Sequence, residues 1–287
     1  ARPFIAAAQK NSSSKNTGGY YFYDLNGKIN HKISEKHRLY LSHYMGDDRF
    51  YLNVSDNYSN DSINGSNTFN SELKWGNIIS AIRWNYMPSN KIFINTTLRY
   101  SKYNFLTGIG VDNSETNNGV LESENFSYNY VSNIIDWSGK IDVDWMPNPN
   151  HLIKAGIGDI YHTFTPGVNT LRYNSSNAQN SSSSFDSTFG AQIEYAHEIE
   201  AYLEDEWTIN NKLKGNFGFH STAFILGDEQ YYSFQPRASA RYLVNDVSSF
   251  KIGYARMAQF LHLLTNTGIG LPTDLWVPAT KKIKPQL

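Results

Sequence analysis

The segment Trp137–Trp145 reads Trp-Ser-Gly-Lys-Ile-Asp-Val-Asp-Trp and alternates between apolar and polar positions. Because successive side chains of a β-strand point to opposite faces, this pattern predicts a strand with one apolar face and one ionic face. In a water-soluble sheet the apolar face would pack on a core. In a transmembrane barrel it would face lipid, with Trp at the interface and the charges in the lumen.

The same alternation recurs along the chain and predicts about ten strands, with an eleventh at Pro3–Gln9. Several of them support alternation for about 14 residues, or ~46 Å, which is ~33 Å along the membrane normal at a 45° tilt. That length crosses a bilayer core. The predicted strands are Tyr20–Ile33, His37–Leu52, Glu72–Met87, Lys91–Leu106, Phe126–Met146, His151–Phe164, Gln192–Ile209, Lys212–Leu226, Gln235–Leu243 and Ser249–Leu264.

The connections between these strands alternate in length. Short turns are expected at Ser34, Pro88, Pro147, Asn210 and Asn245. Between them, long polar loops are expected at Asn53–Asn70, Thr107–Glu124, Thr165–Thr188 and Leu264–Val277. Outer-membrane barrels have this asymmetry, with short periplasmic turns and longer extracellular loops. We therefore expect an all-β, antiparallel up-and-down transmembrane β-barrel, in which these loops would contact the substrate.

Composition narrows the function classes. The chain has 287 residues, a net charge of -1 and no cysteine. The charge gives no sign of nucleic-acid binding, and without cysteine there are no disulfides or thiolate zinc sites. No stretch approaches the ~18 apolar residues of a membrane helix.

The densest charged feature is a set of four glutamates on one face of the predicted strand Gln192–Ile209: Glu198, Glu200, Glu204 and Glu206. They could form an acidic site for a metal or a cationic substrate. We favour a lumen wall whose carboxylates pair with cations of neighbouring strands, because Lys214, Arg237, Arg241 and Lys251 have the parity to face inward. Asp159 and Asp205 fall on the apolar face of their strands, and we expect them near a membrane interface or a bulge.

Four aromatic residues lie close to the expected short turns: Trp84, Tyr86, Trp145 and Trp207. Membrane barrels place aromatic girdles at both interfaces, so we interpret these residues as interface aromatics. The alternative is that they are ordinary core residues of a soluble sheet.

No pattern in the chain predicts catalysis or a cofactor. The eight histidines show no ligand spacing, and the chain has no GxSxG, no P-loop and no GxGxxG motif. We therefore expect no enzyme activity, no cofactor and no metal site.

Five parts of the chain resemble the barrel strands and loops of TonB-dependent outer-membrane receptors, and one of them is Arg38–Ser42 with Gly46–Phe50 after it. Tyr21–Asn30 resembles a barrel strand of that family, and Glu200–Trp207 resembles its recurrent E-x-Y-x-x-D-E-W strand. Pro236–Tyr242 is similar to its P-R-x-S-x-R-Y strand. Leu264–Pro278 resembles a loop of the branch with a carboxypeptidase-regulatory-like N-terminal domain, which includes SusC-like relatives.

The resemblance implies a 22-stranded barrel with an N-terminal plug, located in the outer membrane of a Gram-negative bacterium. It implies active import of a glycan, peptide, ferric chelate or cobalamin, with the TonB complex, outer-membrane lipid and a surface lipoprotein lid as partners. Residues 1–287 would then be a partial barrel of about 10–11 strands, because the chain shows no plug domain and no C-terminal strand that ends in an aromatic. Lys284–Leu287 is expected to begin a further strand.

Three other functions stay open at this point. A passive porin-like channel would lack a plug, and a secreted β-sheet adhesin or lectin would bury its Ile and Trp faces against another sheet. A barrel-surface enzyme is the fourth hypothesis, and no residue constellation supports it.

Overall fold

The computed structural model describes residues 14–177, 181–190, 192–266 and 273–287. The described residues form β-strands and turns, and the sheet is antiparallel throughout. Among them, no helix is long and apolar enough to cross a membrane.

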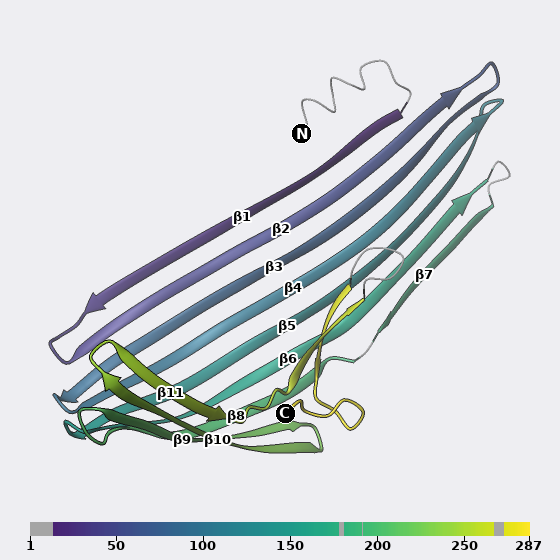
Figure 1. The fold of residues 1–287 in the computed structure, drawn as a ribbon. Helices are drawn as coiled ribbons and strands as arrows, with labels where there is room; N and C mark the ends of the chain where they lie inside the picture. Colours follow the sequence, from purple (N-terminus) through teal and green to yellow (C-terminus); the bar gives the residue numbers. More distant parts are fainter. Residues whose placement is uncertain (1–13, 178–180, 191, 267–272) are drawn as a thin grey trace.

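Ten strands follow one another in an up-and-down sheet, in the order β1-β2-β3-β4-β5-β6-β8-β9-β10-β11 (Figure 1). The strand bounds are β1 Ser14–Lys32, β2 His37–Ser59, β3 Ile63–Ser89, β4 Ile92–Asn117, β5 Val120–Asn148, β6 His151–Ser176, β7 Ser182–Gly190, β8 Glu194–Thr208, β9 Leu213–Leu226, β10 Glu229–Asn245, β11 Ser248–Ala255, β12 Leu261–Asn266 and β13 Thr273–Pro278.

This architecture confirms the prediction of an all-β, antiparallel up-and-down sheet. The short turns occur where the sequence predicts them, after Lys32, Ser89, Asn148, Thr208 and Asn245. Within the described residues the sheet does not close, because β1 and β11 each pair on one side only. The expected strand Pro3–Gln9 lies outside the described residues.

The prediction of long loops at the other end of the sheet is wrong. Residues 53–70 and 107–124 continue the flanking strands, and the turns between them are short. One of these turns is Asn118-Gly119, with φ of 49° and 81°, which suits a two-residue hairpin turn. Most of 165–188 is likewise paired, between β6 and β7. The sheet is therefore asymmetric in the length of its strands and not in the length of its turns.

Apolar–polar alternation does not predict these strand extensions, because polar side chains occupy both of their faces. The backbone ladder continues without apolar alternation, and cross-strand polar pairs support it. The Ser66 and Ser114 hydroxyls lie 2.9 Å apart, and the Tyr58 hydroxyl donates to Glu115 Oε2 at 3.0 Å. This hydrogen bond raises the pKa of the Tyr58 phenol.

The C-terminal part of the chain leaves the sheet, which corrects the single strand expected at Ser249–Leu264. β11 ends at Ala255, and Leu261–Asn266 pairs with Thr273–Pro278 to form the separate hairpin β12–β13. Gln286 pairs with Gln259 as an isolated bridge, so Lys284–Leu287 does not start a strand along the sheet edge. Figure 1 shows the hairpin in yellow, in front of the sheet and inside its curl.

The hairpin segment covers a small apolar core on the concave side of the sheet, which we call the inner face. Phe164 and Phe224 point to this face and are fully buried. The Phe224 ring stacks on Phe260 with 5.2 Å between centroids, and Ala279 and Trp276 join the same cluster. The inner face therefore holds the core that lies under residues 258–261 and 276–279.

The register of the strands steps steadily along the sheet. The residues level with His37 of β2 are Tyr86 on β3, Val143 on β5, Leu203 on β8 and Pro236 on β10. We count residues from this row to the short turns that follow β1, β3, β5, β8 and β10. These distances are roughly two, four, six, seven and ten residues. This is about one residue, or ~3.3 Å, for each strand spacing of ~4.8 Å, and it gives a tilt of about 35°. Closed barrels have tilts of about 35–45°.

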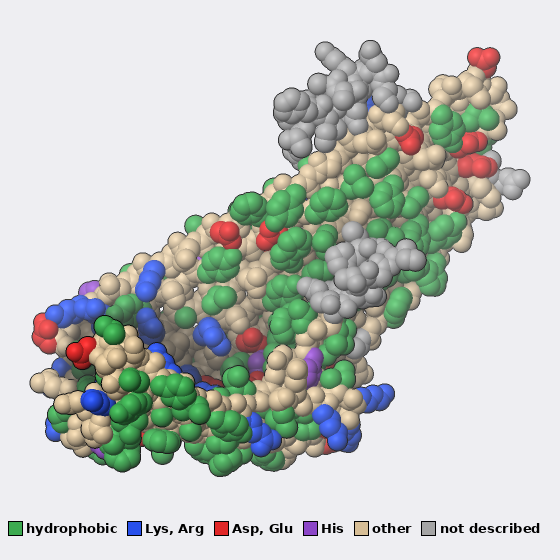
Figure 2. Space-filling model, in the orientation of Figure 1, with side chains coloured by type: hydrophobic (Ala, Val, Ile, Leu, Met, Phe, Trp, Pro, Cys, Tyr) green, Lys and Arg blue, Asp and Glu red, His purple; other side chains and the backbone are tan. Residues whose placement is uncertain are grey.

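The convex side of the sheet, the outer face, carries a belt of exposed apolar side chains. Leu98 is 60% exposed, Trp137 61% and Ile157 59%, although all three lie in mid-sheet. In Figure 2 the outside of β9–β11, in the lower foreground, is largely green. The outer belt includes Leu25, Ile29, Leu41, Ile82, Leu98, Trp137, Ile141, Trp145, Ile157, Leu203, Phe217, Tyr232, Phe234, Tyr242, Phe250 and Ile252.

Candidate functional site

The four glutamates of β8 lie on the inner face, as their parity predicts. Their neighbours Ile199, Leu203 and Trp207 lie on the outer face and are exposed there. In Figure 2 the hollow behind the lower foreground contains Lys or Arg, Asp or Glu, and His side chains. Charge on the described sheet is thus concentrated on the side opposite the outer belt.

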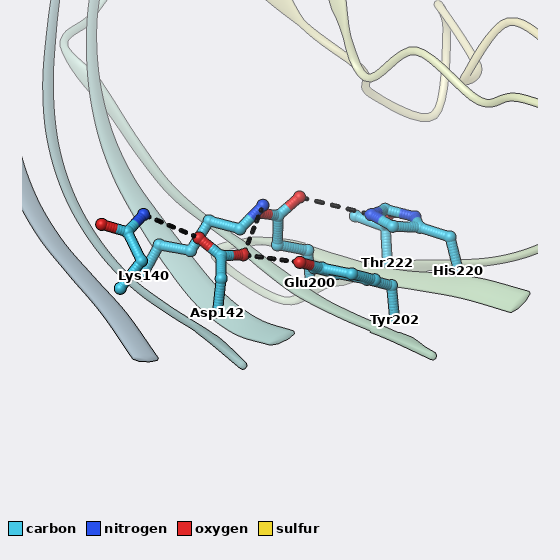
Figure 3. A network of polar contacts seen from close by, with 7 residues as sticks. Lys140, Asp142, Glu200, Tyr202, His220 and Thr222 are labelled. Atoms are coloured by element: carbon cyan, nitrogen blue, oxygen red, sulfur yellow. Dashed lines mark hydrogen bonds and ion pairs between the residues drawn. The ribbon is translucent and has the colours of Figure 1, made fainter. Parts of the chain in front are cut away.

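Glu200 is the centre of an inner ionic network (Figure 3). Its Oε1 accepts from Lys140 Nζ of β5 at 3.0 Å, and its Oε2 lies 3.3 Å from His220 Nε2 of β9. Half-burial raises the cost of the glutamate charge, and the Lys140 ammonium together with the His220 contact offsets it. The network therefore ties three strands together through side chains.

Asp142 extends the network toward the short turns. Its Oδ1 accepts from the Tyr202 hydroxyl at 2.7 Å and lies 3.5 Å from Lys140 Nζ. Lys140 Nζ also lies 5.0 Å from the centroid of the Tyr202 ring, which adds a cation–π contact. On the far side Thr222 Oγ1 accepts from Gln235 Nε2 at 3.1 Å.

The other three glutamates are also engaged. Glu206 pairs with Lys154 of β6, and Glu204 accepts from Asn216 Nδ2 at 2.6 Å. Glu198 Oε2 lies 3.5 Å from His162 Nε2.

His162 is only 2% exposed and links two acids across the sheet. Its Nδ1 lies 2.7 Å from Asp136 Oδ1, opposite its contact with Glu198. Removing either acid would leave one ring nitrogen of the buried His162 without its carboxylate partner.

The cations expected to pair with the glutamates lie elsewhere on the inner face. Lys214, Arg237 and Arg241 are exposed, and the ion pairs of the described residues do not include them. The partners instead come from β5, β6 and β9. Sequence reasoning missed Lys140, Lys154, His162 and His220. Lys140 is two strands away and reaches Glu200 across Gly158. Lys154, His162 and His220 contact their glutamates diagonally, two residues from the directly opposite position.

The predicted interface aromatics lie on the outer face close to the short turns. Trp84 and Tyr86 stack with His37, with 5.6 and 4.5 Å from its ring to theirs. Trp207 stacks on His151 at 5.5 Å, and Trp145 is 45% exposed. These residues form an aromatic border along the lower edge of the outer belt.

Two aspartates interrupt the apolar outer face, and each has a histidine partner. Asp159 Oδ2 lies 2.9 Å from His197 Nδ1, and Asp205 Oδ2 lies 2.8 Å from His151 Nδ1. Each histidine lies on the neighbouring strand, two residues from the residue directly opposite its aspartate. The sequence shows the aspartates but not these diagonal contacts.

The described residues contain no group of three or more His, Cys, Asp or Glu side chains placed to hold a metal ion. No family model matches the chain, and no curated protein matches it. What the inner face offers chemically is a wall of ion pairs around Glu200, Glu206 and His162, with further exposed cations nearer the short turns. Such a wall can line an aqueous space and hold polar groups.

Proposed function

We propose that these strands form part of the wall of a transmembrane β-barrel in the outer membrane of a Gram-negative bacterium. We further propose that the protein is a TonB-dependent receptor that imports a nutrient. The outer face would contact lipid and the inner face would line the lumen.

The observation that carries this proposal is the outer belt. Monomeric soluble proteins rarely expose contiguous apolar patches larger than a few hundred Å², and this belt crosses all ten strands of the up-and-down sheet. A lipid environment explains exposed side chains such as Leu98, Trp137 and Ile157 on one face and paired charges on the other.

The dimensions of the belt agree with a membrane. On β5 it runs from Ile135 to Trp145, which is ~33 Å along the strand and ~27 Å along an axis tilted by 35°. Outer-membrane barrels carry an apolar band about 25 Å tall. Above it on the same face lie polar pairs, including Arg49 Nε with Glu72 Oε1 at 2.6 Å.

The two free sheet edges require partners. Unpaired backbone groups are not tolerated in lipid, so β1 and β11 must pair with further strands. We propose that these strands come from another segment of the same protein, with a plug inside the closed barrel.

The import role rests on the sequence motifs and on the inner face. Glu200–Trp207 and Pro236–Tyr242, the two most family-like strands, line the inner face with charge. Paired charges on a lumen wall give a hydrated surface for a polar cargo or a plug. Glycans, peptides, ferric chelates and cobalamin remain the candidate cargo classes.

Fractionation and uptake measurements test the two parts of the proposal. We expect the protein in the outer-membrane fraction, resistant to carbonate extraction. Deleting its gene should abolish growth on one of the four nutrient classes, and a protonophore should stop that uptake in the parent strain. Recovery in the soluble fraction would contradict the proposal that these strands form the wall of a membrane barrel. Uptake that persists with the protonophore would contradict active import.

A further inference from the structure

Three cations lie level with one another on the inner face, near the short turns. Arg241 of β10 is directly opposite Lys214 of β9 and directly opposite Lys251 of β11. All three side chains are exposed. We call them the cationic row. Like charges directly opposite each other destabilise a sheet, so this arrangement calls for a compensating anion.

The described residues do not supply that anion. No hydrogen bond or ion pair of theirs joins a carboxylate to the cationic row. Among the residues that the structure describes, Glu206 is the one acid that lines the same pocket, and Lys154 already engages it. The inner ionic network lies further up the sheet and pairs its own carboxylates, as Figure 3 shows for Glu200 and Asp142.

A pocket of about 380 Å³ lies over the row. Its lining includes the hydroxyl residues Thr208 and Ser239 and the turn residues Pro149 and Asn150. The site thus presents hydroxyl groups and three cations in a space large enough for a small molecule.

We propose that this pocket binds a phosphate-type oxyanion through Lys214, Arg241 and Lys251. The guanidinium fork of Arg241 matches two oxygens of such a group, and the two ammonium groups supply point charges on either side. This inference stands on the register and the pocket, and it holds whether or not the outer face meets lipid.

The phosphate group could belong to a soluble phosphate or to a lipid headgroup, and two probes separate these sources. Inorganic phosphate and monomeric short-chain phosphatidic acid are titrated into the purified protein by calorimetry. Equal affinity for both assigns the site to a soluble phosphate. At least about tenfold tighter binding of phosphatidic acid assigns it to a lipid headgroup.

The variants Arg241→Gln and Lys251→Gln should each weaken phosphate binding by at least about tenfold. Lys15→Gln, which removes an exposed cation from the opposite end of the sheet, should leave it unchanged. Thermal unfolding of each variant checks that the sheet is intact. Equal phosphate affinity in folded Arg241→Gln and the parent, or no binding to the parent at millimolar phosphate, would overturn the proposal.

Discussion

Replacing Leu98 with arginine is expected to destabilise the protein in lipid vesicles by about 2–4 kcal/mol. Leu98 lies in the middle of the outer belt and is 60% exposed. An arginine on the lipid face of a barrel costs about this much at the bilayer midplane. Reversible denaturant unfolding from vesicles measures the change in unfolding free energy.

Asn104→Arg is the matched control for this substitution. Asn104 lies on the same strand and the same face, six residues above Leu98 and beyond the upper edge of the belt. Near the interface the cost falls to about 0–1 kcal/mol. If Leu98 instead met water, arginine there would change stability by no more than about 0.5 kcal/mol, and that result would contradict a lipid-facing belt.

Replacing Phe224 with alanine is expected to cost about 3–5 kcal/mol and to release the C-terminal segment from the inner face. Phe224 is fully buried and stacks on Phe260, which joins the sheet to the segment before β12. The cavity would remove the main aromatic contact between them. Amide hydrogen exchange should therefore speed up in residues 258–264 and 275–280 relative to β4 and β5.

Phe217→Ala provides the comparison for Phe224→Ala. Phe217 is on the same strand, but it points to the outer face and is 51% exposed. Its loss should leave exchange in the C-terminal segment unchanged. Equal exchange in Phe224→Ala and the parent would show that the hairpin does not depend on the inner-face core.

The sequence predicts the parts of the fold that alternation controls. The segment Trp137–Trp145 has the predicted faces, and the short turns after Ser89 and Asn148 are where the pattern indicates. The strand extensions could not be read in the same way, because polar residues on both faces of segments such as 107–117 leave no period of two. Asn118-Gly119 was the available hairpin signal there.

The inner ionic network could be predicted only in part. Parity alone puts Glu200 and Lys140 on the inner face, because each lies between outward apolar neighbours. Their contact depends on the pairing of β5 with β6 and of β6 with β8, which places Gly158 directly between Lys140 and Glu200, so that the two side chains meet across a glycine. Likewise, the inward packing of Phe260, Trp276 and Ala279 depends on contacts with Phe164 and Phe224, which are distant in sequence.

A nitroxide scan of β5 tests the lipid-facing wall most directly, and the chain has no cysteine to interfere with labelling. Single cysteines at Ser138, Gly139, Ile141, Val143 and Asp144 would carry the label, with the protein in lipid vesicles. We predict high collision rates with oxygen at 139, 141 and 143, and with a water-soluble nickel chelate at 138 and 144. High nickel accessibility at 139, 141 and 143, or no access of either reagent there, would contradict the account.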